Sequence, residues 1–459
     1  MTPFDLVITG GTLVTASEMF AAEVGISGER IAAIGRELDR TGARHIDASG
    51  QLVLPGAVDP HVHLDIDAGA TRSSDDFETG TIAAACGGTT TIIDFVEPEI
   101  GGSLVAGLAA RLKDAEGKAV IDYALHMTLR RGDAQTLGQV PEAMRAGCTS
   151  FKTYTTYDGF RLTDLELLAA LAAVAAAGGL VLVHAENDAV IEARRRAFIA
   201  AGQTAPRFHP RTRPVPVEAE AVERALSLAE VAGCPLYVVH TSTARGADAI
   251  ARARARGQRA YGETCPQYLV LTDTEYERPG FEGAKFVCSP PLRPADNPPG
   301  LWRHLAAGSL QTVGTDHCPF FYSGQKDLGR DDFTRIPNGL PGIEARLAIL
   351  YTCGVGQGRL TPTRWVELCC TAPAQIFGLF PRKGALLPGA DADIVIFDPH
   401  QRVTLSRAVL HERVDYTPYD GLALEGYPVL TIARGQVIAS AGQFVGAPGR
   451  GQFLKRGGA

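Results

Sequence analysis

The sequence predicts an α/β protein, in which a (β/α)8 barrel carries a small β-sandwich formed by both ends of the chain. Through the middle of the chain, eight short apolar runs are spaced by stretches that include alanine-rich helices, a pattern typical of a parallel barrel. Short β-like runs with glycine turns precede and follow that region. The predicted parts are residues 1–54 for the first half of the sandwich, 55–385 for the barrel, and 386–459 for the second half and the C-terminal tail.

The barrel prediction depends on the eight apolar runs and on the helical stretches between them, such as residues 164–177 and 218–232. The carboxyl ends of the strands meet at one face of a barrel, and active sites of this fold lie there. Polar residues gather at those ends in this sequence. The predicted strands are 57–64, 89–96, 121–127, 150–155, 180–185, 235–241, 259–264 and 310–316.

The two ends of the chain are each too short for an independent core. Residues 1–54 hold only brief strands, such as 4–8 and 12–14, and a sheet of that size needs a partner. The runs at 392–397 and 429–438 have the same character. We therefore predict one sandwich assembled from both ends.

Composition limits the possible partners and the compartment. The chain has 459 residues, is 45% hydrophobic and carries a formal net charge of -7, so a large core is possible and nucleic acid is not an expected partner. No apolar run is long enough to cross a membrane, and residues 1–9 lack the features of a signal peptide. Nine scattered cysteines without a C-x-x-C pair indicate reduced thiols, and we predict a cytoplasmic location.

His61 and His63 follow the apolar run 52–57 and are two residues apart. On a strand they project from the same face, where two imidazoles can bind one metal ion. Two surface histidines on an edge strand would give the same pattern. The choice between these alternatives depends on the rest of the chain.

Three later runs also end in a residue that can bind a metal: His184, His240 and Asp316. One such histidine is more often a hydrogen-bonded structural residue, but several at one barrel mouth are difficult to explain by structure alone. Four neutral imidazoles and a carboxylate match a borderline metal such as zinc.

Lys152 lies in another predicted strand, 150–155. Burial and nearby metal charge would lower its pKa and favour a neutral amine. A neutral amine can react with carbon dioxide to give a carbamate, which is a carboxylate on a long stem. The alternative is a lysine that extends to solvent.

Nine motifs spread over nearly the whole chain occur in the order found in one family. The sequence resembles the cyclic amidohydrolases and, within them, the dihydropyrimidinase and D-hydantoinase family. The motifs are HVHLD at 61–65, SSDDFETGT at 73–81, GGTT at 87–90, SFK at 150–152, VHAEN at 183–187, GETCPQYL at 262–269, SPPLR at 289–293, GTDHC at 314–318 and PNGLPG at 337–342.

The resemblance implies a site with two zinc ions, or other divalent metals. His61, His63 and Asp316 would hold one ion, and His184 and His240 the other. Lys152, modified to N6-carboxylysine by carbon dioxide, and a hydroxide would bridge them. The hydroxide would attack a ring amide, and Asp316 would pass its proton to the leaving nitrogen.

The resemblance also implies substrate contacts from Tyr157, Ser289 and Asn338, with the Tyr157 hydroxyl stabilising the oxyanion. The segment after Lys152 departs from the family's Met-Ala-Tyr pattern, so Tyr154 competes for that role. A packed core tyrosine and an asparagine favoured by a turn are the alternatives for Tyr157 and Asn338.

The expected substrate is a small neutral cyclic ureide or imide. Dihydroorotase-like relatives carry an arginine at the position of Asp65, and allantoinase-like relatives tend to carry asparagine there. This favours dihydrouracil, dihydrothymine or a 5-substituted hydantoin, opened to an N-carbamoyl amino acid. Leu64, Ile66, Tyr154 and Phe160 are candidates to line an apolar substituent pocket.

Two other functions are kept as alternatives: an allantoinase-like cyclic amidohydrolase and a non-catalytic protein that forms assemblies. The second is disfavoured because every ligand position is filled. The resemblance also implies a homo-oligomer, either a tetramer or a dimer. Composition and hydropathy, as described above, predict no nucleic-acid or membrane partner.

Overall fold

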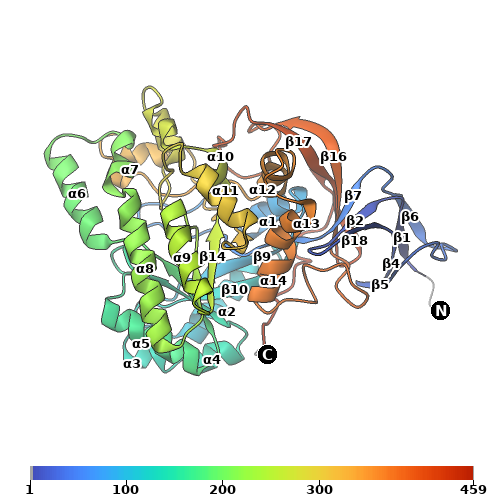
Figure 1. The fold of residues 1–459 in the computed structure, drawn as a ribbon, viewed down its shortest axis with the longest axis horizontal. Coiled ribbons are helices and arrows are strands. Elements are labelled where there is room, and N and C mark those ends of the chain that lie inside the picture. Colours follow the sequence, from blue (N-terminus) through green and yellow to red (C-terminus); the bar gives the residue numbers. More distant parts are fainter. Residues whose placement is uncertain (1–3, 458–459) are drawn as a thin grey trace.

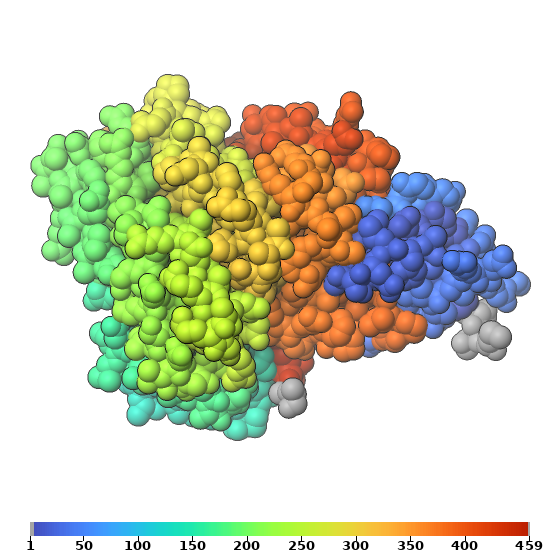
Figure 2. Space-filling view, in the orientation of Figure 1, coloured from blue at the N-terminus to red at the C-terminus, as the bar shows by residue number. Residues whose placement is uncertain are grey.

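The computed structural model of the chain describes residues 4–457. Residues 1–3 and 458–459 lie outside that range. They belong to the predicted sandwich, and residues 1–3 also to the segment searched for a signal peptide. Strands from the blue N-terminal segment and the orange-red C-terminal segment lie side by side at one end of the molecule (Figure 1). Figure 2 shows the blue segment protruding there, with orange parts of the chain between it and the green barrel helices.

Eight parallel strands form the barrel sheet in sequence order, which confirms the predicted fold class. All but one of their residues are buried, because helices cover the outer face and side chains fill the interior. The strands are β8 (Ala57–Asp59), β9 (Thr89–Val96), β10 (Asp122–Thr128), β11 (Ser150–Tyr154), β12 (Leu180–His184), β13 (Leu236–Val238), β14 (Ala260–Thr264) and β15 (Thr312–Val313).

Three strands are shorter than predicted, so His61, His63, His240 and Asp316 lie in the loops that follow β8, β13 and β15. Pro60 has no N–H to donate to a strand ladder, which helps to end β8. His240 and Asp316 have φ angles of 36° and 52°, a left-handed conformation that cannot continue a strand. The predicted strand ends were wrong, but the residues still reach the barrel mouth.

The helices begin mostly at side-chain caps or prolines. At the start of α5, for example, Thr163 and Glu166 form a capping box, and α8 ends at Gly233, whose φ is +64°. Within residues 4–457, every helix is too short or too polar to cross a bilayer. The helices are α1 (Phe77–Cys86), α2 (Leu104–Ala115), α3 (Ala134–Leu137), α4 (Val140–Arg145), α5 (Asp164–Ala176), α6 (Asp188–Ala200), α7 (His209–Thr212), α8 (Val215–Ala232), α9 (Ala244–Ala255), α10 (Pro266–Val270), α11 (Pro298–Ala306), α12 (Arg346–Leu350), α13 (Pro362–Val366) and α14 (Ala372–Ile376).

Two sheets form the sandwich, and one of them contains strands from both ends of the chain, as predicted. β16 pairs antiparallel with β7, and buried residues of both sheets, such as Ile8 and Ile394, share one apolar cluster. The first sheet has β5 (Arg30–Gly35), β4 (Glu23–Ser27), β1 (Leu6–Thr9) and β6 (Arg44–Asp47). The second has β19 (Gln443–Phe444), β18 (Gln436–Ser440), β17 (Ala423–Ala433), β16 (Ile394–Thr404), β7 (Leu52–Pro55), β2 (Thr12–Val14) and β3 (Met19–Ala21).

A buried lysine joins the barrel to the sandwich. Lys383 Nζ lies 2.7 Å from Asp122 Oδ2 at the start of β10, 2.8 Å from Asp393 Oδ2 and 2.9 Å from Asp391 Oδ2. Burial alone would lower the pKa of Lys383, but the three carboxylates outweigh burial and raise it. The ion cluster therefore depends on a charged lysine.

Replacing Lys383 by methionine is expected to lower the free energy of unfolding by about 3–5 kcal/mol, because three buried carboxylates lose the ammonium group that they share. Arg382→Met is the matched control: its guanidinium bonds Asp391 at 2.9 Å, but its side chain is 43% exposed, so its loss is expected to cost less than about 1 kcal/mol. Urea unfolding of both variants measures the difference. Equal midpoints would show that the cluster does not stabilise the junction.

Candidate functional site

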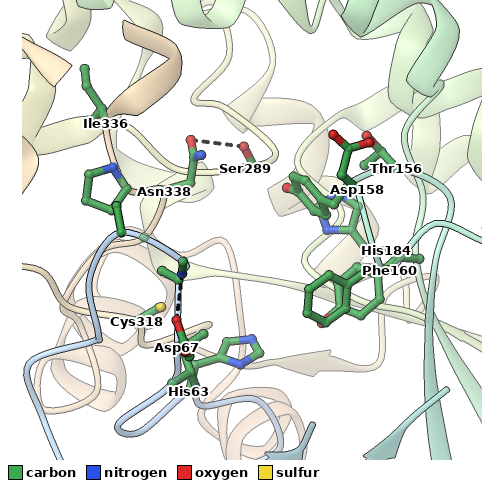
Figure 3. A pocket seen from close by; sticks show the side chains of 18 of the residues that line it. His63, Asp67, Thr156, Asp158, Phe160, His184, Ser289, Cys318, Ile336 and Asn338 are labelled. Atoms are coloured by element: carbon green, nitrogen blue, oxygen red, sulfur yellow. Dashed lines mark hydrogen bonds between the residues drawn. The ribbon is translucent and has the colours of Figure 1, made fainter. Parts of the chain in front are cut away.

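A cavity of about 1020 Å³ opens at the carboxyl ends of the barrel strands, where the sequence predicted the site. Nearly every predicted site residue lines it. Figure 3 shows Ser289 and Asn338 near one another, with Thr156, Asp158, Phe160 and His184 on the other side of the cavity. The predicted residues on its wall are His63, Lys152, Tyr154, Tyr157, His184, His240, Ser289, Asp316 and Asn338, and His61 is buried directly behind His63.

Three ligand atoms from His61, His63 and Asp316 converge. The two Nε2 atoms are 3.2 Å apart, and Asp316 Oδ1 lies 3.3 Å from that of His61 and 3.2 Å from that of His63. Two imidazole nitrogens and one carboxylate oxygen form a donor set that zinc binds. The structure therefore brings together the first predicted group of ligands.

The second predicted group lies beside the first. His184 Nδ1 is 3.0 Å from His240 Nε2, and Lys152 Nζ is 3.5 Å from His61 Nε2. Lys152 is buried, and its amino group lies against the rings of Phe95 and Tyr154. All six predicted ligands thus share one buried region.

Burial sets the protonation of this cluster. It lowers the pKa of His61 and His240 well below the usual histidine value, and it also lowers that of His184. Burial lowers the pKa of Lys152 to about 8, although the carboxylates of Asp316 and Glu263 oppose this shift. Neutral imidazoles have a free lone pair, which a metal ligand requires.

Two glutamates orient the imidazoles. His61 Nδ1 donates to Glu263 Oε1 at 2.7 Å, and His184 Nε2 donates to Glu186 Oε2 at 2.8 Å. Each bond leaves the opposite ring nitrogen with a lone pair that faces the cluster. Glu263 also accepts from the His240 backbone N–H at 2.9 Å.

Arg213 contacts Glu186 and also lines the cavity. Burial would raise the pKa of Glu186, but the guanidinium of Arg213 together with His184 and Arg293 outweighs that effect, and the pKa falls to about 2. The sequence prediction assigned no role to Arg213, Glu186 or Glu263. The only signal for the glutamates was their place inside two of the motifs, at VHAEN and GETCPQYL.

Left-handed backbone recurs at the site. Tyr157 has a φ angle of 79°, and His240 and Asp316 share this conformation. Non-glycine residues rarely adopt it, and it persists where the surroundings fix the chain. Such backbone is typical of positions that aim a side chain at a ligand.

Both candidate tyrosines face the cavity. The Tyr157 ring centroid lies 4.9 Å from that of His184, and the Tyr154 ring stacks on the same imidazole at 5.8 Å. The choice of Tyr157 over Tyr154 therefore stays a prediction. Opposite them, Ser289 Oγ donates to Asn338 Oδ1 at 3.3 Å (Figure 3).

The predicted lining of the substituent pocket was partly wrong. Ile66, Tyr154 and Phe160 line the cavity, but Leu64 is fully buried in the barrel core, where it lies against Gly80. Asp65 is also absent from the cavity wall, because its carboxylate accepts a hydrogen bond from Arg72 Nε at 3.0 Å. The identity of residue 65 thus says little about the charge of the substrate.

A barrel with histidines, an aspartate and a buried lysine converging at its mouth defines a class, the barrel hydrolases with a candidate metal centre. Residues 52–438 match the model of the Amidohydrolase family. The chain is 48% identical to a D-hydantoinase of Geobacillus stearothermophilus, over 98% of this chain and 96% of that one.

Solved structures of two similar proteins have the same fold as this chain. The D-hydantoinase of a Bacillus species has a TM-score of 0.97 at 48% identity, covering 98% of this chain and 99% of that one. The dihydropyrimidinase of Brevibacillus agri has a TM-score of 0.97 at 46% identity, covering 98% of both. The chain belongs to the amidohydrolase family, among its hydantoinases and dihydropyrimidinases, as the motifs predicted. It is a cyclic amide hydrolase.

The orienting role of Glu263 gives a prediction. Glu263→Gln is expected to weaken metal retention about 10–100-fold, because an amide replaces the carboxyl group that fixes the His61 tautomer. Metal content after dialysis against graded chelator measures this. Asp248→Asn is the matched control, since Asp248 Oδ1 accepts from His304 Nε2 at 3.0 Å outside the cavity. Equal retention in both variants would contradict the role of Glu263.

Proposed function

We propose that the protein opens dihydropyrimidines, such as dihydrouracil and dihydrothymine, and 5-substituted hydantoins to N-carbamoyl amino acids, with zinc at the barrel mouth. The observation that carries the proposal is the convergence of five imidazole or carboxylate ligands and a buried lysine on one cavity. The relatives named D-hydantoinase and dihydropyrimidinase support this class of ring. No separate observation favours allantoin as the substrate.

The donor set fits two zinc ions. His61, His63 and Asp316 would hold one ion, and His184 and His240 the other. Burial lowers the pKa of His61, His184 and His240, and glutamates orient the rings of His61 and His184, as ligation requires. When bound, two such ions lower the pKa of a water molecule and polarise a carbonyl group.

Lys152 would complete the site as a carbamate. Its amino group is buried, and within residues 4–457 no carboxylate forms an ion pair with it. A pKa of about 8 leaves an appreciable neutral fraction near pH 7. The neutral nitrogen forms a bond to the carbon of carbon dioxide and releases one proton, and the product is an anionic ligand.

The remaining residues would handle the substrate. Ser289 and Asn338 hold the ureide edge, and the Tyr157 hydroxyl donates to the oxygen that gains charge. Asp316 faces the cavity and is placed to carry a proton from water to the leaving ring nitrogen. Hydrolysis breaks the ring C–N bond, so that the carbonyl carbon gains OH and the nitrogen gains H.

Turnover of a panel of cyclic ureides and imides tests the proposal. Zinc-loaded protein is expected to open dihydrouracil and 5-substituted hydantoins with kcat/KM at least about tenfold above that for allantoin or dihydroorotate, a difference of about 1.4 kcal/mol. Preference for allantoin or dihydroorotate would overturn the substrate assignment. The family relationship also supports a homo-oligomer, and we retain the predicted cytoplasmic location.

Lys152→Ala separates a carbamate from an ordinary ammonium. Removing a cation from the cluster would leave metal affinity unchanged or improve it, whereas removing an anionic ligand is expected to lower the number of ions retained. Elemental analysis after dialysis measures this sign directly. Tight retention of two ions by Lys152→Ala without any added acid would show that Lys152 is not a ligand.

Acid rescue provides the control for the lysine experiment. Propionate supplied with zinc is expected to restore part of the activity of Lys152→Ala, because a small carboxylate enters the space of the missing stem. Lys152→Arg is not expected to respond, since arginine keeps a fixed charge and fills that space.

Tyr157→Phe is expected to reduce kcat about 10²–10³-fold with unchanged metal content, because one donor to the oxyanion is lost. Tyr154→Phe is the matched control, since its ring faces the same imidazole. Steady-state rates of both variants decide the assignment. If the loss appears in Tyr154→Phe and not in Tyr157→Phe, the role belongs to Tyr154.

A further inference from the structure

Another buried lysine, in addition to Lys152 and Lys383, lies behind the cavity wall. Lys326 begins the short 3-10 helix η4 (Lys326–Gly329), and its side chain is fully buried. Its Nζ donates to the backbone oxygens of Val287 at 2.9 Å and Pro337 at 3.0 Å. Within residues 4–457 it forms no ion pair, unlike the buried Lys383.

The two acceptors belong to the segments that carry Ser289 and Asn338. Val287 lies two residues before Ser289, and Pro337 directly precedes Asn338. The same segments also meet through the Gly339 N–H, which donates to the Val287 oxygen at 3.1 Å. Lys326 therefore holds together, from behind, the two residues that share a hydrogen bond in Figure 3.

The energetics indicate that these bonds are the reason for a lysine here. A buried amino group without a carboxylate is unfavourable, and an apolar side chain of similar length would fill the space at lower cost. Burial lowers the pKa of Lys326 to about 7, and the thiols of Cys288 and Cys318 face it. A neutral amine has two N–H groups, which match the two carbonyl acceptors.

The residue before Lys326, Gln325, forms hydrogen bonds to a third segment of the cavity wall. Gln325 Nε2 donates to Thr71 Oγ1 at 2.5 Å and to the Arg72 oxygen at 2.7 Å. Thr71 ends the stretch 66–71 that lines the cavity. Residues 325 and 326 thus link three cavity walls that are far apart in the sequence.

We propose that Lys326 is a positioning residue for the reaction: its two hydrogen bonds fix the distance between the segments of Ser289 and Asn338, and so shape the wall that binds the ureide. The inference rests on the proposed function, because that function supplies the ligand of this wall. Lys326 does not touch the substrate and acts through the two segments.

Lys326→Met tests the proposal, because methionine fills a similar space without donating. KM for dihydrouracil is expected to rise about tenfold or more, with kcat reduced less than about threefold, since the wall binds ground state and transition state alike. Lys285→Met is the matched control: Lys285 is partly exposed and pairs with Glu282 at 2.6 Å on the neighbouring η3 (Glu282–Phe286). Its KM is expected to stay within about twofold.

Two further readouts distinguish positioning from general stability. In an Asn338→Ala background, Lys326→Met is expected to add little to KM, because both changes act on one wall. In protein as purified, amide exchange of Gly339 is expected to accelerate in Lys326→Met while amides of β11 and β12 keep their rates. If Lys326→Met does not accumulate in folded form, Lys326→Gln replaces it with the same expectations, at smaller magnitude.

The outcomes separate the two proposals. An unchanged KM and unchanged Gly339 exchange in Lys326→Met, with wild-type protein active on dihydrouracil, would overturn the positioning role alone. A KM increase that is fully additive with Asn338→Ala would also overturn it. Absence of any turnover of cyclic ureides by wild-type protein would overturn the proposed function and the inference together.

Discussion

The closure of the barrel beyond its strand ends is the constraint on which the rest of the site depends. The His63 N–H donates to the His317 oxygen at 2.8 Å, and the Asp316 N–H donates to the His61 oxygen at 2.9 Å. These two bonds join the loops that follow the first and last strands and, at the same time, set the positions of three predicted ligands. The hydrogen bonds that close the barrel therefore also fix the geometry of these ligands.

Buried polar groups support that closure one layer below. Arg346 Nη1 donates to the oxygens of Val58 at 3.0 Å and Val313 at 2.8 Å, which lie on the first and last strands. Asp59 accepts from the Thr315 N–H at 3.1 Å and from its hydroxyl at 2.7 Å. Because the strands β8 and β15 are short, side chains supply much of the closure that a longer ladder would give.

The electrostatics of the site follow from the same burial. Burial lowers the pKa of His61, His184 and His240 and so favours their neutral form. Glutamates fix which nitrogen of His61 and His184 carries the proton. Lys152 is buried in the same region, and burial lowers its pKa by destabilising the ammonium form. A neutral amine at this position can become the anionic carbamate ligand proposed above. Burial of the side chains and orientation of the imidazole rings thus favour the binding of metal cations by this cluster.

The fold and the ligand candidates could be predicted because both leave local patterns. Apolar runs mark the strands, and His61 and His63 keep their spacing although β8 ends before them. The prediction that Leu64 lines the cavity was wrong, because Leu64 follows His63 in an extended segment and so points to the opposite side. The role of Glu263 was missed because its only signal was a place in the motif GETCPQYL, and its partner His61 lies 202 residues away. Lys326 was missed for the same reason, because its acceptors belong to distant loops.

Elemental analysis combined with turnover tests the central claim most directly. Protein purified without chelators and active on dihydrouracil or a hydantoin is expected to contain about two divalent ions per chain, mainly zinc, and to lose activity in proportion as they are removed. Full activity in protein that contains no transition metal would contradict the account.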